Sequence, residues 1–319
     1  MLPSPMPMHI PDGFLSTLVA LVLWACSALV IGYALKRVGE DLGEKQVPTM
    51  GVLAACIFAG QMLNFPVTGG TSGHLLGAAL VTIVLGPWAA ILVMTCVVGI
   101  QALVFQDGGL LVLGANLFNM AIVGSAVSYF VYQTIQKLVK ARPLGLFLGG
   151  FSAGWVSIVV AALACGLQLA LSGRSPANLA IPAMAGIHAL IGIGEGLITA
   201  AALAFIYASR RELLDAQAAP SGRASKVVWL SGLAIAVLLA IASPLASAHP
   251  DGLEWVAEQK GFLDTAREPL YRLIPDYLVP GIANESLATI VAGIVGLLAV
   301  GGTAYAVAAV RRRRQDTTA

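Results

Sequence analysis

Nine apolar segments, most of them long enough to cross a lipid bilayer, constrain this chain more than any other feature. A helix needs about 20 apolar residues to span a hydrocarbon core about 30 Å thick. Only 11% of the 319 residues are charged and 58% are hydrophobic, whereas soluble chains average about 25% charged residues. Lipid must be the main solvent, so we predict an all-α polytopic transmembrane bundle. The predicted spans are residues 14–36, 47–63, 73–85, 87–106, 114–136, 144–171, 181–208, 227–246 and 286–309.

The segment 73–85 is the exception, because at about 1.5 Å per residue a helix of this length covers only about 20 Å. Gly86-Pro87 ends it. We predict a half-helix, or a helix that is displaced or buried among its neighbours, since lipid does not tolerate unpaired backbone groups.

The distribution of basic residues predicts the orientation. With the N-terminus outside, fourteen of the 18 Lys and Arg residues fall on the cytoplasmic side and the other four fall outside. This asymmetry follows the positive-inside rule and predicts a cytoplasmic C-terminus in the cell membrane. The run Arg311–Arg314 is interpreted as a cytoplasmic anchor rather than a nucleic-acid patch, so lipid and not nucleic acid is the expected partner.

A polar stretch divides the chain into two units. Residues 211–226 are rich in charged and small residues and are typical of a linker. We predict a seven-span unit at residues 1–210, this cytoplasmic linker, and a two-span unit at residues 227–319. The second unit carries an outside loop at residues 247–285.

Enzymatic motifs are absent. The chain contains no GxxxxGK[ST], HExxH or GxSxG sequence, so we predict neither a P-loop ATPase nor a hydrolase of these classes, and no organic cofactor. If ATP drives transport, a partner must hydrolyse it. The four cysteines lie in apolar runs without a CxxC pair, which favours small buried residues over ligands.

Two of the four histidines lie at the predicted outer ends of spans. His9 stands in MHIPDG before the first span, and His74 ends the glycine-rich stretch NFPVTGGTSGH. Imidazole is a common ligand for Ni²⁺ and Co²⁺. On spacing alone, a metal site and an outside turn with a histidine at a helix start both remain open. Candidates to orient the imidazoles by hydrogen bonds are Asp12, Asn64, Thr71 and Ser72.

A histidine in the second position of a chain has a particular chelating geometry. If the functional chain begins at Met8, its free amine, the His9 amide nitrogen and His9 Nδ1 lie in one plane, and His74 fills the fourth corner. Such a set suits Ni²⁺ and Cu²⁺. The leader MLPSPMP would remove the amine, so the site predicts a functional start at Met8 rather than Met1.

Three stretches, MHIPDGFLS, NFPVTGGTSGHLLG and GIHALIGIGEGLIT, resemble the nickel and cobalt substrate-binding membrane component of energy-coupling factor transporters, the NikM/CbiM family. The resemblance covers about residues 8–210. Residues 227–310, with AHPDGLE, resemble the auxiliary subunit NikN/CbiN, so the chain is similar to a fusion of the two. The resemblance implies import of Ni²⁺ or Co²⁺, held by Met8, His9 and His74, with a membrane scaffold subunit and ATPase subunits as partners. The planar nitrogen set favours nickel.

Four further residues are candidates for function. His188 and Glu195 lie two helical turns apart in the span 181–208 and share a face. An ionisable residue inside a membrane suggests function. Glu195 is a candidate proton relay or a packing contact, and the glycines around it favour packing. In the outside loop, His249 and Asp251 are candidates for transient metal capture, and an ordinary solvated loop is the alternative.

Two other functions remain open from the sequence. The first is a stand-alone, proton-coupled secondary metal transporter that uses Glu195, which predicts uptake without an ATPase partner. The second is a non-transporting membrane scaffold or metal sensor, which predicts no transported metal.

Overall fold

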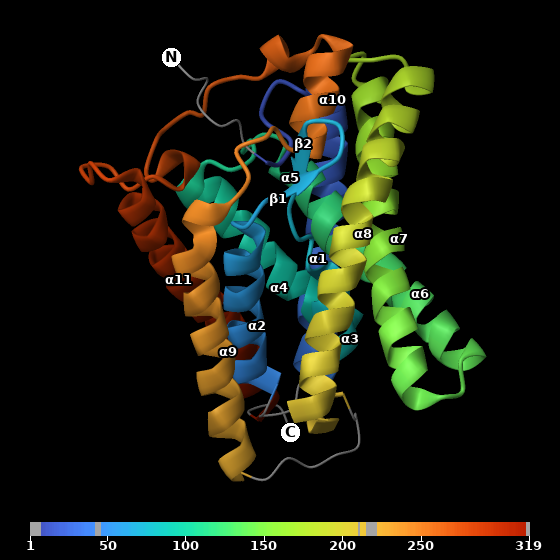
Figure 1. Ribbon diagram of the computed structural model, residues 1–319, viewed down its shortest axis with the longest axis vertical. Coiled ribbons are helices and arrows are strands. Elements are labelled where there is room, and N and C mark those ends of the chain that lie inside the picture. Colours follow the sequence, from blue (N-terminus) through green and yellow to red (C-terminus); the bar gives the residue numbers. More distant parts are fainter. Residues whose placement is uncertain (1–7, 42–45, 210, 215–221, 317–319) are drawn as a thin grey trace.

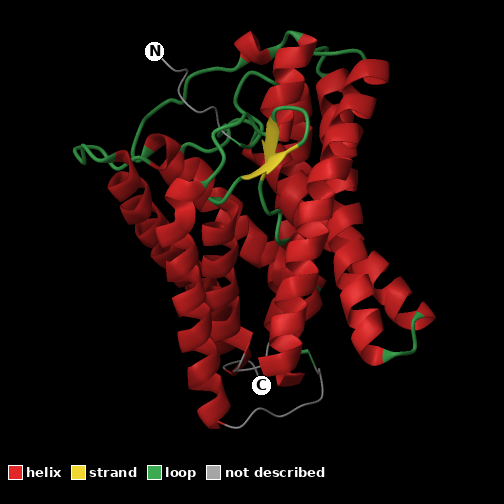
Figure 2. Ribbon diagram, in the orientation of Figure 1, coloured by secondary structure: helices red, strands yellow, loops and turns green. Residues whose placement is uncertain are grey.

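A computed structural model describes residues 8–41, 46–209, 211–214 and 222–316, and these residues are mainly helical (Figures 1 and 2). The leader at residues 1–7 and the linker residues 215–221 lie outside the described ranges. The long helices are α1 (Thr17–Asp41), α2 (Gln46–Gln61), α4 (Pro87–Ile100), α6 (Gly124–Leu138), α7 (Arg142–Leu171), α8 (Ala177–Ser209), α9 (Gly222–Ala242) and α11 (Glu285–Asp316). The short helices are α3 (Ala78–Leu85), α5 (Leu113–Asn116) and α10 (Gly252–Lys260), and π-helical turns continue the chain at Gln101–Phe105 and Leu117–Val123.

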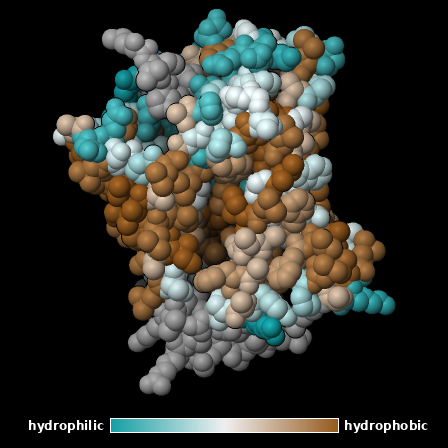
Figure 3. All heavy atoms as spheres, viewed as in Figure 1, coloured by the Kyte–Doolittle hydropathy of each residue, from teal (hydrophilic) through white to brown (hydrophobic). Residues whose placement is uncertain are grey.

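The predicted all-α membrane architecture is confirmed. Six helices in the described ranges are long and apolar enough to cross a membrane: Thr17–Val38, Pro87–Phe105, Leu113–Leu138, Pro143–Leu171, Ala177–Ser209 and Glu285–Arg312. The shorter apolar helices Gln46–Gln61 and Trp229–Leu245, together with α3, occupy the other three predicted positions. Apolar side chains dominate the middle of the face in Figure 3, and hydrophilic side chains gather at its upper end.

The predicted short segment 73–85 is a half-helix, but its start was predicted five residues too early. Helix α3 begins at Ala78, because Gly77 adopts φ 81°, which no right-handed helix includes. Residues 71–73 instead form strand β2 (Thr71–Gly73), which pairs antiparallel with β1 (Phe65–Val67). This hairpin was not predicted, and it ends directly before His74.

The outside loop at residues 247–285 also has structure that hydropathy did not predict. It contains α10, which begins at the cap residue Asp251, whose Oδ1 accepts the Glu254 N–H at 2.7 Å. Short 3₁₀ turns follow at Leu263–Thr265 and Pro275–Tyr277. In Figure 1, α10 lies above the β1–β2 hairpin at the upper end of the bundle.

The C-terminal helices α9 and α11 pack against α2, so the two predicted units share an interface. The backbones of α2 and α11 approach each other closely, since a Cβ on Gly51 would lie 2.8 Å from the Gly301 carbonyl oxygen. Close backbone contact between small residues is typical of helix pairs in membranes.

Replacing Gly51 with alanine is therefore expected to lower the free energy of unfolding by about 1–3 kcal/mol, because the new methyl group meets backbone that cannot rotate away. Thermal unfolding in detergent measures the effect. Gly302→Ala is the matched control, since nothing lies within 4 Å of its Cβ position. Equal unfolding temperatures for the two variants would contradict the described contact.

Candidate metal site

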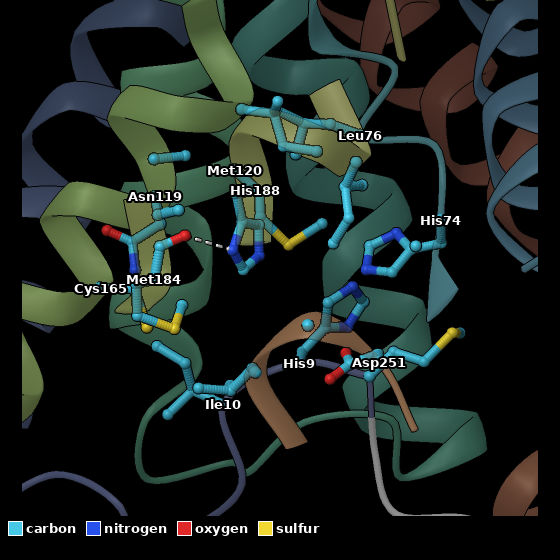
Figure 4. A pocket seen from close by; sticks show the side chains of 18 of the residues that line it. His9, Ile10, His74, Leu76, Asn119, Met120, Cys165, Met184, His188 and Asp251 are labelled. Atoms are coloured by element: carbon cyan, nitrogen blue, oxygen red, sulfur yellow. Dashed lines mark hydrogen bonds between the residues drawn. The ribbon is translucent and has the colours of Figure 1, made fainter. Parts of the chain in front are cut away.

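The imidazoles of His9 and His74 lie next to each other (Figure 4). Their ring centroids are 5.5 Å apart and the ring planes are nearly perpendicular, at 84°. His9 lies in the segment before α1, and His74 lies between β2 and α3. The structure thus brings together the two histidines on which the metal interpretation depends.

The His9 segment is fixed by hydrogen bonds between side chains and backbone, which join it to α5 and to the residues directly before α5. The Ile10 N–H donates to Asn116 Oδ1 and Asn116 Nδ2 donates to the Ile10 carbonyl, both at 3.1 Å. The Asp12 carboxylate accepts the N–H groups of Leu111 at 2.9 Å and Val112 at 3.2 Å. Asp12 therefore anchors this segment, and its carboxylate bonds to backbone rather than to an imidazole.

Asp107 is the direct partner of His9. The His9 amide donates to Asp107 Oδ1 at 3.3 Å, and His9 Nδ1 donates to the Asp107 carbonyl oxygen at 3.2 Å. The Tyr277 hydroxyl donates to Asp107 Oδ2 at 2.6 Å. Burial and the negative charge of Asp107 raise the pKa of Tyr277 well above its usual value, so its hydroxyl stays a donor. His9 Nε2 is buried and has no hydrogen-bond partner among the residues that the structure describes.

The sequence prediction missed Asp107, Asn116 and Tyr277. One signal pointed to Asp107: it is the sole charged residue between positions 87 and 136, at the end of an apolar run. Nothing in the local sequence marked the other two, because each acts on a segment more than 100 residues away.

His74 is held as a neutral ring. Its Nδ1 donates to the Leu75 carbonyl oxygen at 3.1 Å. Burial, and then the neighbouring His9, lower the pKa of His74 to about 4. At pH 7 the ring is therefore in the uncharged form that binds metals. Behind it, Gly73 packs so closely on α8 that a Cβ would lie 2.3 Å from Ile191 Cγ2.

Both histidines line a cavity of about 90 Å³. His188 of α8 also lines it, with its Nδ1 bonded to the Met184 carbonyl at 2.8 Å. In Figure 4, His9 and His74 stand on one side of this cavity and Met184 and Cys165 on the other. Glu195, two turns beyond His188, does not line the cavity; it is fully buried and bonds to backbone N–H groups before α3.

A second cavity of about 300 Å³ adjoins the first, and Met8 and Asp251 line both. Four further acids line it, Asp107, Glu254, Glu258 and Asp276, beside uncharged polar residues and the two residues Asn64 and His249. Burial raises the pKa of Asp251, and burial with the nearby Glu258 charge raises the pKa of Glu254 to about 7. The negative charges of these acids repel one another, and a cation between them would reduce that repulsion.

The sequence predicts that Thr71 and Ser72 orient an imidazole, but their hydroxyls bond elsewhere. Thr71 Oγ1 donates to the Pro250 carbonyl at 3.0 Å, and Ser72 Oγ donates to the His249 carbonyl at 2.8 Å. The Ser72 N–H also donates to the Pro250 carbonyl at 2.8 Å. These residues dock the hairpin on the second unit. Asn64 lines the acidic cavity, and its Oδ1 is buried without a partner.

No group of three His, Cys, Asp or Glu side chains in the described ranges is arranged to hold a metal ion. Two imidazoles face each other, and any further ligands at this place must come from other atoms. The sequence offers the backbone nitrogens of residues 8 and 9 as such ligands.

Comparisons with known proteins find matches to both parts of the chain. Residues 9–213 match the CbiM family, described as the cobalt uptake substrate-specific transmembrane region, and residues 226–313 match the PDGLE domain. A putative fused nickel transport protein NikMN of Archaeoglobus fulgidus is 40% identical over 92% of this chain and 95% of its own length. The fused nickel transport protein NikMN of Rhodobacter capsulatus is 31% identical over 79% of this chain and 76% of its own length. A solved structure of a truncated transition metal transporter is 37% identical, covers 63% of this chain and 98% of that chain, and superposes with a TM-score of 0.56.

Proposed function

The chain belongs to the CbiM family of nickel and cobalt transport proteins, and we propose that it is the substrate-binding subunit of an ATP-driven energy-coupling factor importer for Ni²⁺ or Co²⁺. In this proposal residues 1–210 bind the ion and residues 227–319 form the auxiliary unit, joined by the linker 211–226. A membrane scaffold subunit and ATPase subunits supply the energy. The N-terminus lies outside and the C-terminus lies in the cytoplasm, in line with the positive-inside asymmetry.

The observation that carries this proposal is the contact between His9 and His74 beside a cavity. Two adjacent imidazoles, that of His9 buried and that of His74 partly buried, satisfy the preference of Ni²⁺ and Co²⁺ for nitrogen ligands. The test is the metal content of the purified chain by mass spectrometry, with the intact mass recorded on the same sample. About one Ni or Co per chain is expected, and a chain that retains neither ion after exposure to both would contradict the proposal.

The ligand set that we propose uses the amine and amide nitrogens of residues 8 and 9. His9 N and Nδ1, two members of the set, both donate hydrogen bonds to Asp107. An ion would replace those protons, and the Asp107 carboxylate beside it would offset part of its charge. The Met8 amine and the His74 imidazole would complete a planar group of four nitrogens, which favours nickel.

The acidic cavity supports capture of the ion before it reaches the histidines. Its acids lie at the same end of the bundle as residue 8, and His249 is exposed at its rim. Negative charge concentrated in a cleft raises the local concentration of a cation and its rate of association. Met8 and Asp251 line both cavities and so mark the connection between capture and binding.

Removing two of these charges with Glu254→Gln and Glu258→Gln is expected to slow Ni²⁺ loading about threefold to tenfold at low ionic strength. The metal content at equilibrium should stay at the wild-type level, because neither residue is a proposed ligand. Stopped-flow loading at two salt concentrations measures this, since salt screens the attraction. Glu285→Gln, an exposed acid that does not line the cavity, is the matched control. Equal loading rates in the double variant and the control would exclude the capture role.

A further inference from the structure

A buried carboxylate on α8 contacts the segment that carries His74. Glu195 is 0% exposed, and its two oxygens accept the N–H groups of Leu76 at 2.6 Å and Gly77 at 3.0 Å. These amides directly precede α3, whose N-cap position is held by Gly77, a residue without a side chain. The first amides of a helix need acceptors from outside the helix, and a negative group is favoured at this end. Glu195, which lies on another helix, supplies both the acceptor oxygens and the negative group.

The peptide group between Leu75 and Leu76 links Glu195 to the His74 ring. Its N–H donates to Glu195, and its carbonyl oxygen accepts from His74 Nδ1 at 3.1 Å. Because a carbonyl oxygen can only accept, His74 carries its proton on Nδ1 and keeps its lone pair on Nε2. A carboxylate on the N–H side polarises the peptide and makes its carbonyl a better acceptor. The ring is thereby held in one tautomer.

The same segment is fixed from its other side. The Leu76 carbonyl accepts Gln61 Nε2 at 2.9 Å, and Gln61 Oε1 in turn accepts Gln101 Nε2 at 2.7 Å. Hydrogen bonds behind a metal-binding histidine commonly set its tautomer and orientation. Here the bond comes from a peptide group whose own position depends on Glu195.

We propose that Glu195 is a positioning residue of the metal site, which acts on His74 through the Leu75–Leu76 peptide and so presents His74 Nε2 to a Ni²⁺ or Co²⁺ ion. The identity of the ion rests on the proposed function. The tautomer and order of the His74 segment are properties of the metal-free protein and are tested without it. Anchoring by two backbone bonds also favours the packing role of Glu195 over the proton relay.

The first measurement is ¹⁵N NMR of metal-free protein labelled in its four histidines, with the His74 signals assigned by their loss in His74→Asn. The wild type is expected to show His74 protonated on Nδ1. Glu195→Ala is expected to shift His74 toward the other tautomer and to speed hydrogen exchange at residues 74–79. Glu195→Gln, which keeps the volume and one acceptor oxygen, should lie between the two and decides the question if the alanine variant does not fold.

The matched control is Thr199→Val, one turn further along α8. Thr199 is also 0% exposed, and its Oγ1 has no hydrogen-bond partner, so valine keeps the packing and removes no bond. Its His74 tautomer and exchange should equal those of the wild type. A wild-type tautomer and wild-type exchange in both Glu195 variants would overturn the proposal.

The second measurement is Ni²⁺ affinity by competition with a chelator. Glu195→Ala is expected to weaken binding about 10- to 100-fold, the range found when a group that supports a metal ligand is removed. Thr199→Val should leave the affinity unchanged, and unchanged affinity in Glu195→Ala would overturn the positioning role. If the wild type binds no Ni²⁺ or Co²⁺ while the tautomer and exchange change as expected, the proposed function fails and the coupling of Glu195 to His74 stands.

Discussion

Replacing His74 with alanine is expected to abolish stable retention of Ni²⁺ and Co²⁺, with affinity reduced more than about 100-fold. Residues that only support a metal ligand already contribute 10- to 100-fold, and His74 is proposed as a ligand itself. Its ring is partly buried beside His9 and neutral at pH 7, and no other described group at this position replaces its nitrogen. Metal content after equilibrium dialysis measures the loss.

Two further variants serve as comparisons for this result. His9→Ala should give the same loss, because it removes the imidazole nitrogen that His9 is expected to contribute to the same ion. His249→Ala should retain metal at equilibrium, since His249 is exposed and is proposed only to capture the ion. One Ni per chain in His74→Ala would place the metal elsewhere and remove the basis for the proposed function.

Most of the fold could be predicted because lipid imposes simple rules on the sequence. A spanning helix must be apolar over a fixed length, so hydropathy alone located the nine apolar helices found among the described residues. Gly86 ended the short helix α3 as expected. The start of α3 was predicted wrongly because apolar character continues through Leu75 and Leu76, while the helix is prevented there by the left-handed backbone of Gly77.

The candidate site could be predicted only in part. His9 and His74 stand out since imidazoles are rare in this chain and both precede apolar runs. The groups around them make contacts that no local pattern records. Tyr277 reaches Asp107 across 170 residues, and Glu195 reaches Leu76 across 119. Periodicity reports which face of a helix is apolar, but it does not report which distant polar group that face meets.

The error over Thr71 and Ser72 has the same physical cause. Their place beside His74 suggested that they orient its ring, because short polar side chains often bond to near neighbours. In the structure they donate instead to the carbonyls of Pro250 and His249. Hence the two residues connect the histidine hairpin to the auxiliary unit, and the ring itself is held by a backbone carbonyl.

The start of the chain gives the second large expected effect. A chain made to begin at Met8 is expected to bind about one Ni²⁺, whereas the chain that begins at Met1 should bind more than about 100-fold more weakly, comparable with the loss of a ligand. An amine at residue 8 donates a lone pair to the metal, but the same nitrogen inside a peptide bond does not unless it is deprotonated. Met8 lies at the junction of the two cavities, where such an amine would be close to His9.

The comparison needs a control for length and one for the amine. Intact mass establishes where each chain begins. Acetylation of the Met8 amine in the short chain should reproduce the weak binding of the long chain, because it removes the lone pair without adding residues. If the acetylated chain and the Met1 chain both bind Ni²⁺ as tightly as the free-amine chain, the amine is not a ligand. The ion would then be held by His9 and His74 with other donors, and the planar set that favours nickel over cobalt would no longer apply.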